Sequence, residues 1–80
     1  MTLQEITQQM TEIFRDVLDD PAIVLARATT AADIEDWDSL AQISLLVAIE
    51  REFKIQITLA ESKSLANVGE MIDLVAGKTG

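Results

Sequence analysis

The chain contains neither cysteine nor histidine. Without cysteine it has no disulfide, no thiolate metal site and no thiol nucleophile, and without histidine it lacks the usual general base at neutral pH. Proline occurs once and glycine three times, and no glycine-rich phosphate loop is present. We therefore expect the protein not to be an enzyme, and we expect helix packing alone to stabilise its fold.

Basic residues are also few, because 6 Lys and Arg stand against 14 Asp and Glu, for a net charge of -8. Such a chain repels phosphate backbones, so we expect no nucleic-acid partner. The acidic charge favours partners with basic surfaces. It equally fits a simple role in keeping a small protein in solution.

Long hydrophobic runs are missing as well. The run at residues 45–49 is far shorter than the roughly 20 residues that span a bilayer, so no membrane span is predicted. The early apolar residues are spaced apart and the first basic residue is Arg15, which does not fit a secretory signal. We expect a cytoplasmic location.

What the chain does have is hydrophobic residues, which make up 49% of its 80 positions and suffice for one core. Thr2 and Glu5 predict a capping box at the start of a first helix. This helix is predicted to end near Leu18, before Pro21. Its apolar residues recur at helical spacing, at Leu3, Ile6, Met10, Ile13, Phe14 and Val17.

The next segment, residues 22–38, has no clean apolar period and is interpreted as a long ordered loop without an element of its own. Loops of this length are uncommon unless they are functional. We expect four of its apolar side chains to pack it onto the helices, namely Ile23, Val24, Leu25 and Ile34.

A second helix is predicted from about Ser39 to Phe53, with Asp38 as its N-cap and no glycine or proline inside it. Alternating apolar residues at 55–59 suggest a short extended stretch. Thr58 with Glu61 then predicts a brief third helix.

Asn67 with Glu70 predicts the cap of a last helix, for which Gly77 is the expected stop. The expected fold class is therefore all-α: a small four-helix bundle of three longer helices and one short one, in a single domain over residues 1–80.

The second helix has two apolar faces. Leu45, Leu46, Ile49 and Phe53 form the predicted core stripe. Leu40, Ile43 and Val47 fall on another side, beside Ser44, Arg51 and Lys54. Either the bundle or the long loop covers both faces, or the second face is a patch on which a partner docks.

The acidic cluster before this helix raises the question of a calcium site. An EF-hand loop that starts at Asp33 needs glycine at position 38 and glutamate at position 44, but the chain has Asp38 and Ser44. Capping and the helix dipole already explain acids at this place. We predict no metal site.

Asp38-Ser39-Leu40 at the start of an amphipathic helix resembles the motif of the acyl carrier proteins. The resemblance covers nearly the whole chain. It continues through Ile43, Leu45, Leu46, Val47, Ala48, Ile49, Glu50, Glu52 and Phe53, and then Ile55, Ile57, Glu61, Leu65, Val68, Ile72 and Val75.

This resemblance implies a function. In the family, a separate magnesium-dependent transferase attaches phosphopantetheine from coenzyme A to the motif serine, which here is Ser39. Asp38 matches the acid that presents the site to the transferase, and Leu40, Ile43 and Val47 match positions that face partner enzymes. An apolar cavity beside the second helix is expected to shield the cargo. Without this resemblance, Ser39 is explained as an ordinary first-turn serine and Asp38 as an N-cap.

The chain also departs from the family pattern. Asp36 stands where the family often has glycine, followed by the only tryptophan, Trp37. Ala41 and Ser44 occupy docking-face positions that are acidic in fatty-acid carriers. We therefore favour a polyketide, aminoacyl or other secondary-metabolite pathway over fatty-acid synthesis.

The implied partners are the phosphopantetheinyl transferase and acyl-loading, condensing or acyl-transfer enzymes, with the carrier as a monomer. The alternative is a helical adaptor that is never modified and binds partners through the Leu40, Ile43 and Val47 patch.

Overall fold

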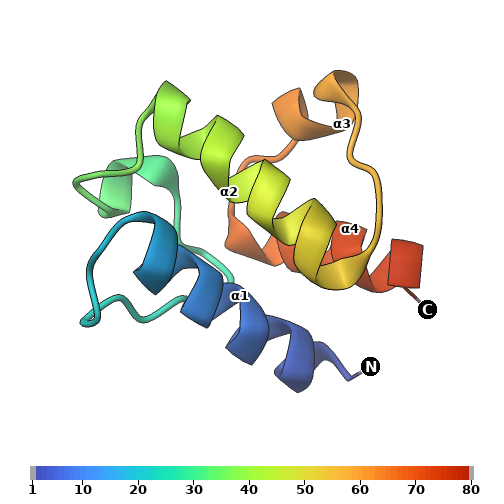
Figure 1. Cartoon of the computed structure of the whole chain (residues 1–80), viewed down its shortest axis with the longest axis horizontal. Helices are drawn as coiled ribbons and strands as arrows, with labels where there is room; N and C mark the ends of the chain where they lie inside the picture. Colours follow the sequence, from blue (N-terminus) through green and yellow to red (C-terminus); the bar gives the residue numbers. More distant parts are fainter. Residues whose placement is uncertain (1, 80) are drawn as a thin grey trace.

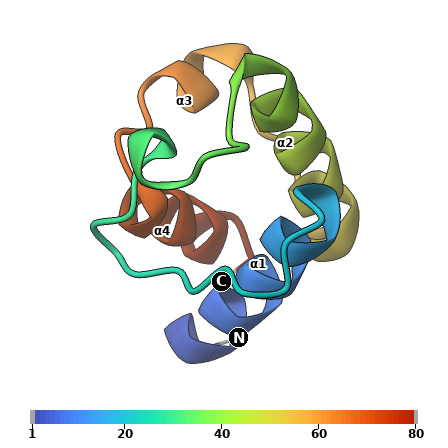
Figure 2. The same cartoon turned by 90° about the vertical axis from the view of Figure 1, so that its left-hand side faces the viewer.

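A computed structural model describes residues 2–79. It is all-helical, with the elements α1 (Leu3–Val17), the 3-10 turn η1 (Ala31–Asp33), α2 (Ser39–Phe53), α3 (Leu59–Lys63) and α4 (Val68–Thr79). Figures 1 and 2 show α1, α2 and α4 as the longer helices, with α3 on the side of the molecule away from α1. No helix formed by residues 2–79 is both long and apolar enough to cross a bilayer.

The capping box predicted for α1 is confirmed. Glu5 N donates to Thr2 Oγ1 at 3.1 Å, and Thr2 N donates to Glu5 Oε1 at 3.0 Å. The helix ends at its C-cap Leu18, and Asp19 then takes a left-handed φ of 52° before Pro21. The two residues that follow the helix thus turn the chain where the sequence predicted its end.

The segment between α1 and α2 differs from its prediction in two respects. It contains η1, where no element was expected, because Asp33 N donates to Thr30 O at 3.0 Å and closes a turn, which the bond from Thr30 N to Asp33 Oδ2 at 2.9 Å supports. Ile23 and Leu25 are buried as predicted and Ile34 is half-buried, but Val24 is 77% exposed. Side chains alternate along an extended backbone, so the residue between two buried ones points outward.

The predicted bounds of α2 are confirmed at both ends. Asp38 caps the helix, since Ala41 N donates to its Oδ1 at 2.8 Å. Lys54 ends it in the left-handed conformation, with a φ of 55°. Leu45, Ile49 and Phe53 are buried, whereas Leu46, predicted to belong to the same stripe, is only half-buried.

The capping box of α3 is also confirmed, with Glu61 N donating to Thr58 Oγ1 at 3.1 Å. For α4 the predicted Asn67 contact forms, because Glu70 N donates to Asn67 Oδ1 at 2.9 Å. The predicted stop at Gly77 is wrong, because α4 continues to Thr79. A glycine stop requires a left-handed φ, and Gly77 does not adopt one.

The core lies where α1 packs against both α2 and α4. Buried residues from these three helices meet buried residues of the α1–α2 loop there. They are Ile6, Met10, Phe14, Leu18, Ile23, Leu25, Trp37, Leu45, Ile49, Phe53, Val68, Met71, Ile72 and Val75.

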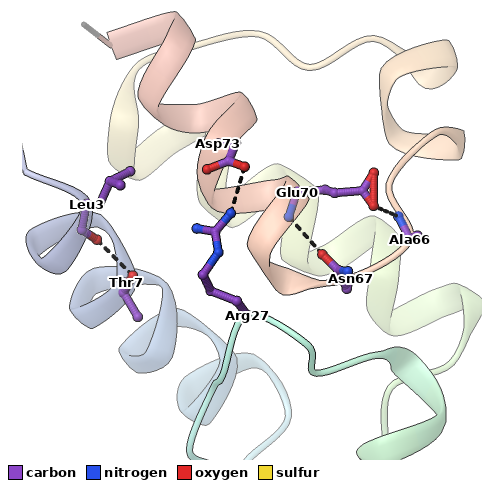
Figure 3. Close-up of polar contacts among 7 residues, drawn as sticks. All are labelled: Leu3, Thr7, Arg27, Ala66, Asn67, Glu70 and Asp73. Carbon is purple, nitrogen blue, oxygen red and sulfur yellow. Dashed lines mark hydrogen bonds and ion pairs between the residues drawn. The ribbon is translucent and has the colours of Figure 1, made fainter.

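The α1–α2 loop is tied closely to the start of α4. Val68 N donates to Thr29 O at 2.9 Å and Gly69 N donates to Arg27 O at 2.8 Å. Arg27 also forms an exposed ion pair with Asp73 at 2.8 Å (Figure 3). A Cβ atom on Gly69 would lie 3.0 Å from both Cβ and O of Arg27, so the close approach of loop and helix favours glycine at this position.

Candidate functional site

Ser39 is the first residue of α2, and its side chain is exposed. Asp38, directly before it, is also exposed and holds Ala41 N with its carboxylate. Within residues 2–79, the backbone N–H groups of Ser39 and Leu40 have no hydrogen-bond acceptor. A reachable hydroxyl therefore stands next to free N–H donors at the positive end of a helix dipole, where an attached anion is favoured.

A cleft of about 650 Å³ opens beside Ser39. One wall is formed by α2, and the other by α3, the segment after it and the first turns of α4. Most of its side chains are apolar. The lining consists of Ala31, Trp37, Asp38, Ser39, Gln42, Ile43, Leu46, Leu59, Ser62, Lys63, Leu65, Ala66, Asn67 and Met71.

Leu46 lines this cleft, which explains why it is only half-buried. The sequence assigned it to the core because it follows Leu45 on the apolar side of the helix. Its neighbours across the cleft do not close over it, so its side chain belongs to the wall of a cavity. An apolar wall next to Ser39 suits a flexible chain with an apolar end.

Trp37 and Gln42 form a pair at the cleft that the sequence did not reveal. Trp37 Nε1 donates to Gln42 Oε1 at 2.6 Å, and the indole packs edge-on against Phe14 with ring centroids 4.9 Å apart. Gln42 lies three residues after Ser39 and therefore on the same side of the helix. That spacing was the one available signal for Gln42 as a site residue.

The second apolar face of α2 is open to solvent. Leu40 is 74% exposed, Ile43 is 61% exposed and Val47 is 47% exposed, and we call these three residues the apolar stripe. Neither the bundle nor the loop covers them, so the first of the two readings of this face is wrong. A contiguous exposed apolar surface on a small protein indicates an interaction site.

The two acids of α2 differ in their position: Glu50 follows Val47 by three residues and lies next to the apolar stripe, whereas Glu52 lies on another side of the helix. Glu50 Oε2 accepts a hydrogen bond from Ile57 N at 3.0 Å, and Glu52 lines a shallow hollow on the α1 side together with Glu12 and Asp16. Arg51 and Lys54, at the far end of the helix, are exposed. None of the three stripe residues is charged, and the one acid of α2 beside them, Glu50, already accepts a hydrogen bond, although the protein as a whole is strongly acidic.

Comparison with known protein families agrees with this geometry. A family model described as "Phosphopantetheine attachment site" matches residues 8–75 of the chain. This range includes Asp38, Ser39, the apolar stripe and all of the residues that line the cleft.

Curated relatives and one solved structure point the same way. An acyl carrier protein of Acidothermus cellulolyticus is 30% identical over 79 residues, which are 99% of this chain and 94% of the relative. One of a Picosynechococcus species is 34% identical over 77 residues, or 96% and 95% of the two chains. The solution structure of holo acyl carrier protein from Geobacter metallireducens superimposes with a TM-score of 0.87 at 46% identity, covering 91% of this chain and 84% of that one.

Proposed function

The chain belongs to the acyl carrier protein family, and from this premise we propose that Ser39 is the residue to which its phosphopantetheine arm is attached. Members of the family are carriers without catalytic activity of their own. When bound, the arm supplies a terminal thiol that holds an acyl group as a thioester. The observation that supports Ser39 is its exposed hydroxyl at the first residue of α2, at the edge of the cleft.

The residues around Ser39 fit such a group. The free N–H groups of Ser39 and Leu40 suit the negative charge of a phosphodiester. Ile43, Leu46 and Met71 offer an apolar wall for an acyl chain. A cleft of about 650 Å³ lies within the range of small-molecule sites.

Attachment is proposed to require a partner, because the chain has no histidine to act as the usual base for the serine proton. In the proposed step Ser39 Oγ forms a bond to the phosphorus of coenzyme A that carries the pantetheine. The bond from this phosphorus to the bridging oxygen breaks, and adenosine 3′,5′-bisphosphate leaves. A base of the magnesium-dependent transferase takes the hydroxyl proton.

Asp38 has two compatible roles in this proposal. Its Oδ1 accepts the Ala41 N–H, which fixes the first turn of α2 and hence the direction of the Ser39 side chain. Its other carboxylate oxygen stays at the surface, since the residue is exposed, and is available to the transferase and its metal.

The test of Ser39 is the intact mass of the protein after incubation with coenzyme A and a broad-specificity phosphopantetheinyl transferase. We expect the wild-type chain to gain the mass of one phosphopantetheine, and Ser39→Ala to gain nothing while keeping its helical circular dichroism. Ser44→Ala is the matched control, since Ser44 is an exposed serine of the same helix outside the cleft, and it should be modified like the wild type.

Two results would count against this assignment. An arm on the Ser39→Ala protein would place the attachment elsewhere. No mass gain on the wild-type chain would favour the alternative function, an unmodified helical adaptor that binds partners through the same apolar stripe.

The apolar stripe, with Asp38 at its leading end, is the proposed docking surface for the transferase and for acyl-handling enzymes. Small interfaces of modest affinity suit successive partners. The three stripe residues are uncharged, so docking is expected to depend on apolar contact more than on charge and to change little with salt.

This charge pattern also bears on the kind of biosynthetic pathway in which the carrier works. A carrier whose stripe is flanked by Ala41, Ser44, Arg51 and Lys54 is a poor match for strongly basic partner surfaces. We infer loading, condensing or acyl-transfer enzymes of a polyketide, aminoacyl or other secondary-metabolite pathway ahead of those of fatty-acid synthesis. The proposal keeps the single domain, monomeric state and cytoplasmic location expected from the sequence.

A further inference from the structure

We propose that Gln42 is a binding residue for the arm itself. In this proposal its side-chain amide N–H groups donate to an acceptor oxygen in the part of the arm next to Ser39, either the phosphate or the first amide carbonyl. The inference rests on the proposed attachment at Ser39. It adds a function for a residue that neither the sequence motif nor the apolar stripe includes.

The first argument is the orientation of the Gln42 amide. An indole N–H only donates, so the atom that Trp37 Nε1 contacts at 2.6 Å must be the amide oxygen. The Nε2 group therefore points away from Trp37. This resolves the usual ambiguity between the oxygen and nitrogen of a glutamine side chain.

The second argument is that Nε2 is left without a partner. Among residues 2–79, no other group forms a hydrogen bond with the Gln42 side chain. The same part of the chain has no buried side-chain nitrogen or oxygen that lacks a partner, so Nε2 of this half-buried residue is not fully buried. Gln42 also lines the cleft. Its two N–H donors are thus available to a group that occupies the cleft.

The third argument is rigidity. Trp37 is only 8% exposed and packs edge-on against the fully buried Phe14, so the indole that holds Gln42 is itself anchored in the core. A donor that is held in place before binding loses less side-chain entropy when it binds.

The fourth argument is position. Residues three apart on a helix have their Cβ atoms about 5–6 Å from each other, so Gln42 sits one turn from Ser39, inside the cleft. Only the portion of the arm close to the serine lies this near. That portion carries the phosphate oxygens and an amide carbonyl, and both accept hydrogen bonds from an amide N–H. The thiol and its cargo lie at the other end.

The experiment uses protein labelled with ¹⁵N and ¹³C, loaded with unlabelled phosphopantetheine, and its unloaded form. We expect the Gln42 side-chain NH₂ signals to shift on loading and to show isotope-filtered NOEs to protons of the arm. The signals of Gln8, which is exposed on α1, are the internal control and should not move.

Variants separate the two acceptors. Gln42→Met keeps the length of the side chain and removes its donors. If the phosphate is the acceptor, this variant shifts the ³¹P signal of the loaded protein. If the carbonyl is the acceptor, the ³¹P signal stays in place and the wild-type NOEs reach the methyl groups beside that amide. Trp37→Phe, which keeps an aromatic ring but lacks the indole donor, should weaken the Gln42 NOEs in both cases.

A fully loaded protein in which the Gln42 signals match those of the unloaded form, with no NOE to the arm, would overturn the inference and leave the attachment at Ser39 standing. If the intact mass shows no loading at all, the attachment proposal fails first and this inference fails with it. The mass measurement therefore distinguishes the two failures.

Discussion

α1 and α2 are each 15 residues long, but they differ in how many of their large apolar side chains are buried. In α1, Ile6, Met10 and Phe14 are fully buried, and among its large apolar side chains only Leu3, at the first position, is exposed. In α2, Leu45 and Ile49 are fully buried, while the three residues of the apolar stripe remain in solvent.

The difference supports the proposal that α2 does more than hold the fold together. Each apolar Å² left in water forfeits about 25 cal/mol of burial free energy, so a helix that only packs is expected to bury its large apolar side chains, as α1 nearly does. The apolar stripe of α2 stays exposed and does not contribute to the core. We propose that it is buried transiently against partner enzymes.

The sharpest test of this comparison is the same substitution on both faces of α2. Ile49 is 0% exposed and Ile43 is 61% exposed. Ile49→Ala should lower the free energy of unfolding by about 2–5 kcal/mol, because it leaves a cavity in the core. Ile43→Ala should change it by no more than about 0.5 kcal/mol. Urea denaturation followed by circular dichroism measures both.

The second half of this test is function. Ile43→Ala should reduce the kcat/KM of arm transfer by the broad-specificity transferase several-fold, since the docking surface loses an anchor. Ile43→Leu is the control that retains an apolar contact. A large loss of stability in Ile43→Ala, with normal transfer, would mean that the stripe belongs to the fold rather than to partners.

The next largest effect on stability is expected when two glycines of α4, one crowded and one in open space, are each replaced by alanine. Gly69→Ala brings a Cβ to 3.0 Å from Arg27 O and Cβ, so the loop must move and stability should fall by about 1–3 kcal/mol. A Cβ on Gly77 meets nothing within 4 Å, and Gly77→Ala should stabilise the helix by about 0.5–1 kcal/mol. Thermal melting compares the two, and effects of the same sign would contradict the close approach of loop and helix.

The smallest effect concerns α3, a five-residue helix with no buried residue. The pKa of Glu61 lies below its ordinary value, because its carboxylate accepts a hydrogen bond from the Thr58 backbone N–H and one from Lys78, whose Nζ lies 3.0 Å away. A lowered carboxyl pKa stabilises the fold above the unfolded pKa, and this contribution is lost as the pH falls through the folded value.

Lys78→Met should therefore raise the pKa of Glu61 toward its ordinary value and move the loss of this contribution to higher pH. The pKa of Glu5, lowered chiefly by the Thr2 backbone N–H, should not change, which makes it the internal reference. An NMR titration of the side-chain carboxyl carbons measures both. An unchanged pKa of Glu61 would show that the Lys78 contact is not maintained in solution.

Local chemistry made several features of this protein predictable. Capping boxes depend on residues three positions apart, so those of Thr2 with Glu5 and of Thr58 with Glu61 could be predicted from the sequence alone. The bounds of α2 followed from Asp38 and from the absence of any breaker up to Phe53. The motif around Ser39 indicated the family in the same way, because its spacing is local.

Other features depend on which groups meet in space. Val24 and Leu46 are as apolar as their buried neighbours, and only the packing shows that one points to solvent and the other lines the cleft. Gly77 has the chemistry of a helix stop but lies in open space within α4.

By itself, the sequence determined where the helices begin, the apolar pattern that allows one core, and the serine that the family motif identifies, because these depend on neighbours along the chain. Only the tertiary structure decided that the apolar stripe stays uncovered, that a cleft opens beside Ser39, and that Phe14, fixed on α1, anchors Trp37 and through it Gln42. The physical reason is that burial and hydrogen bonding between distant segments are set by how the helices pack.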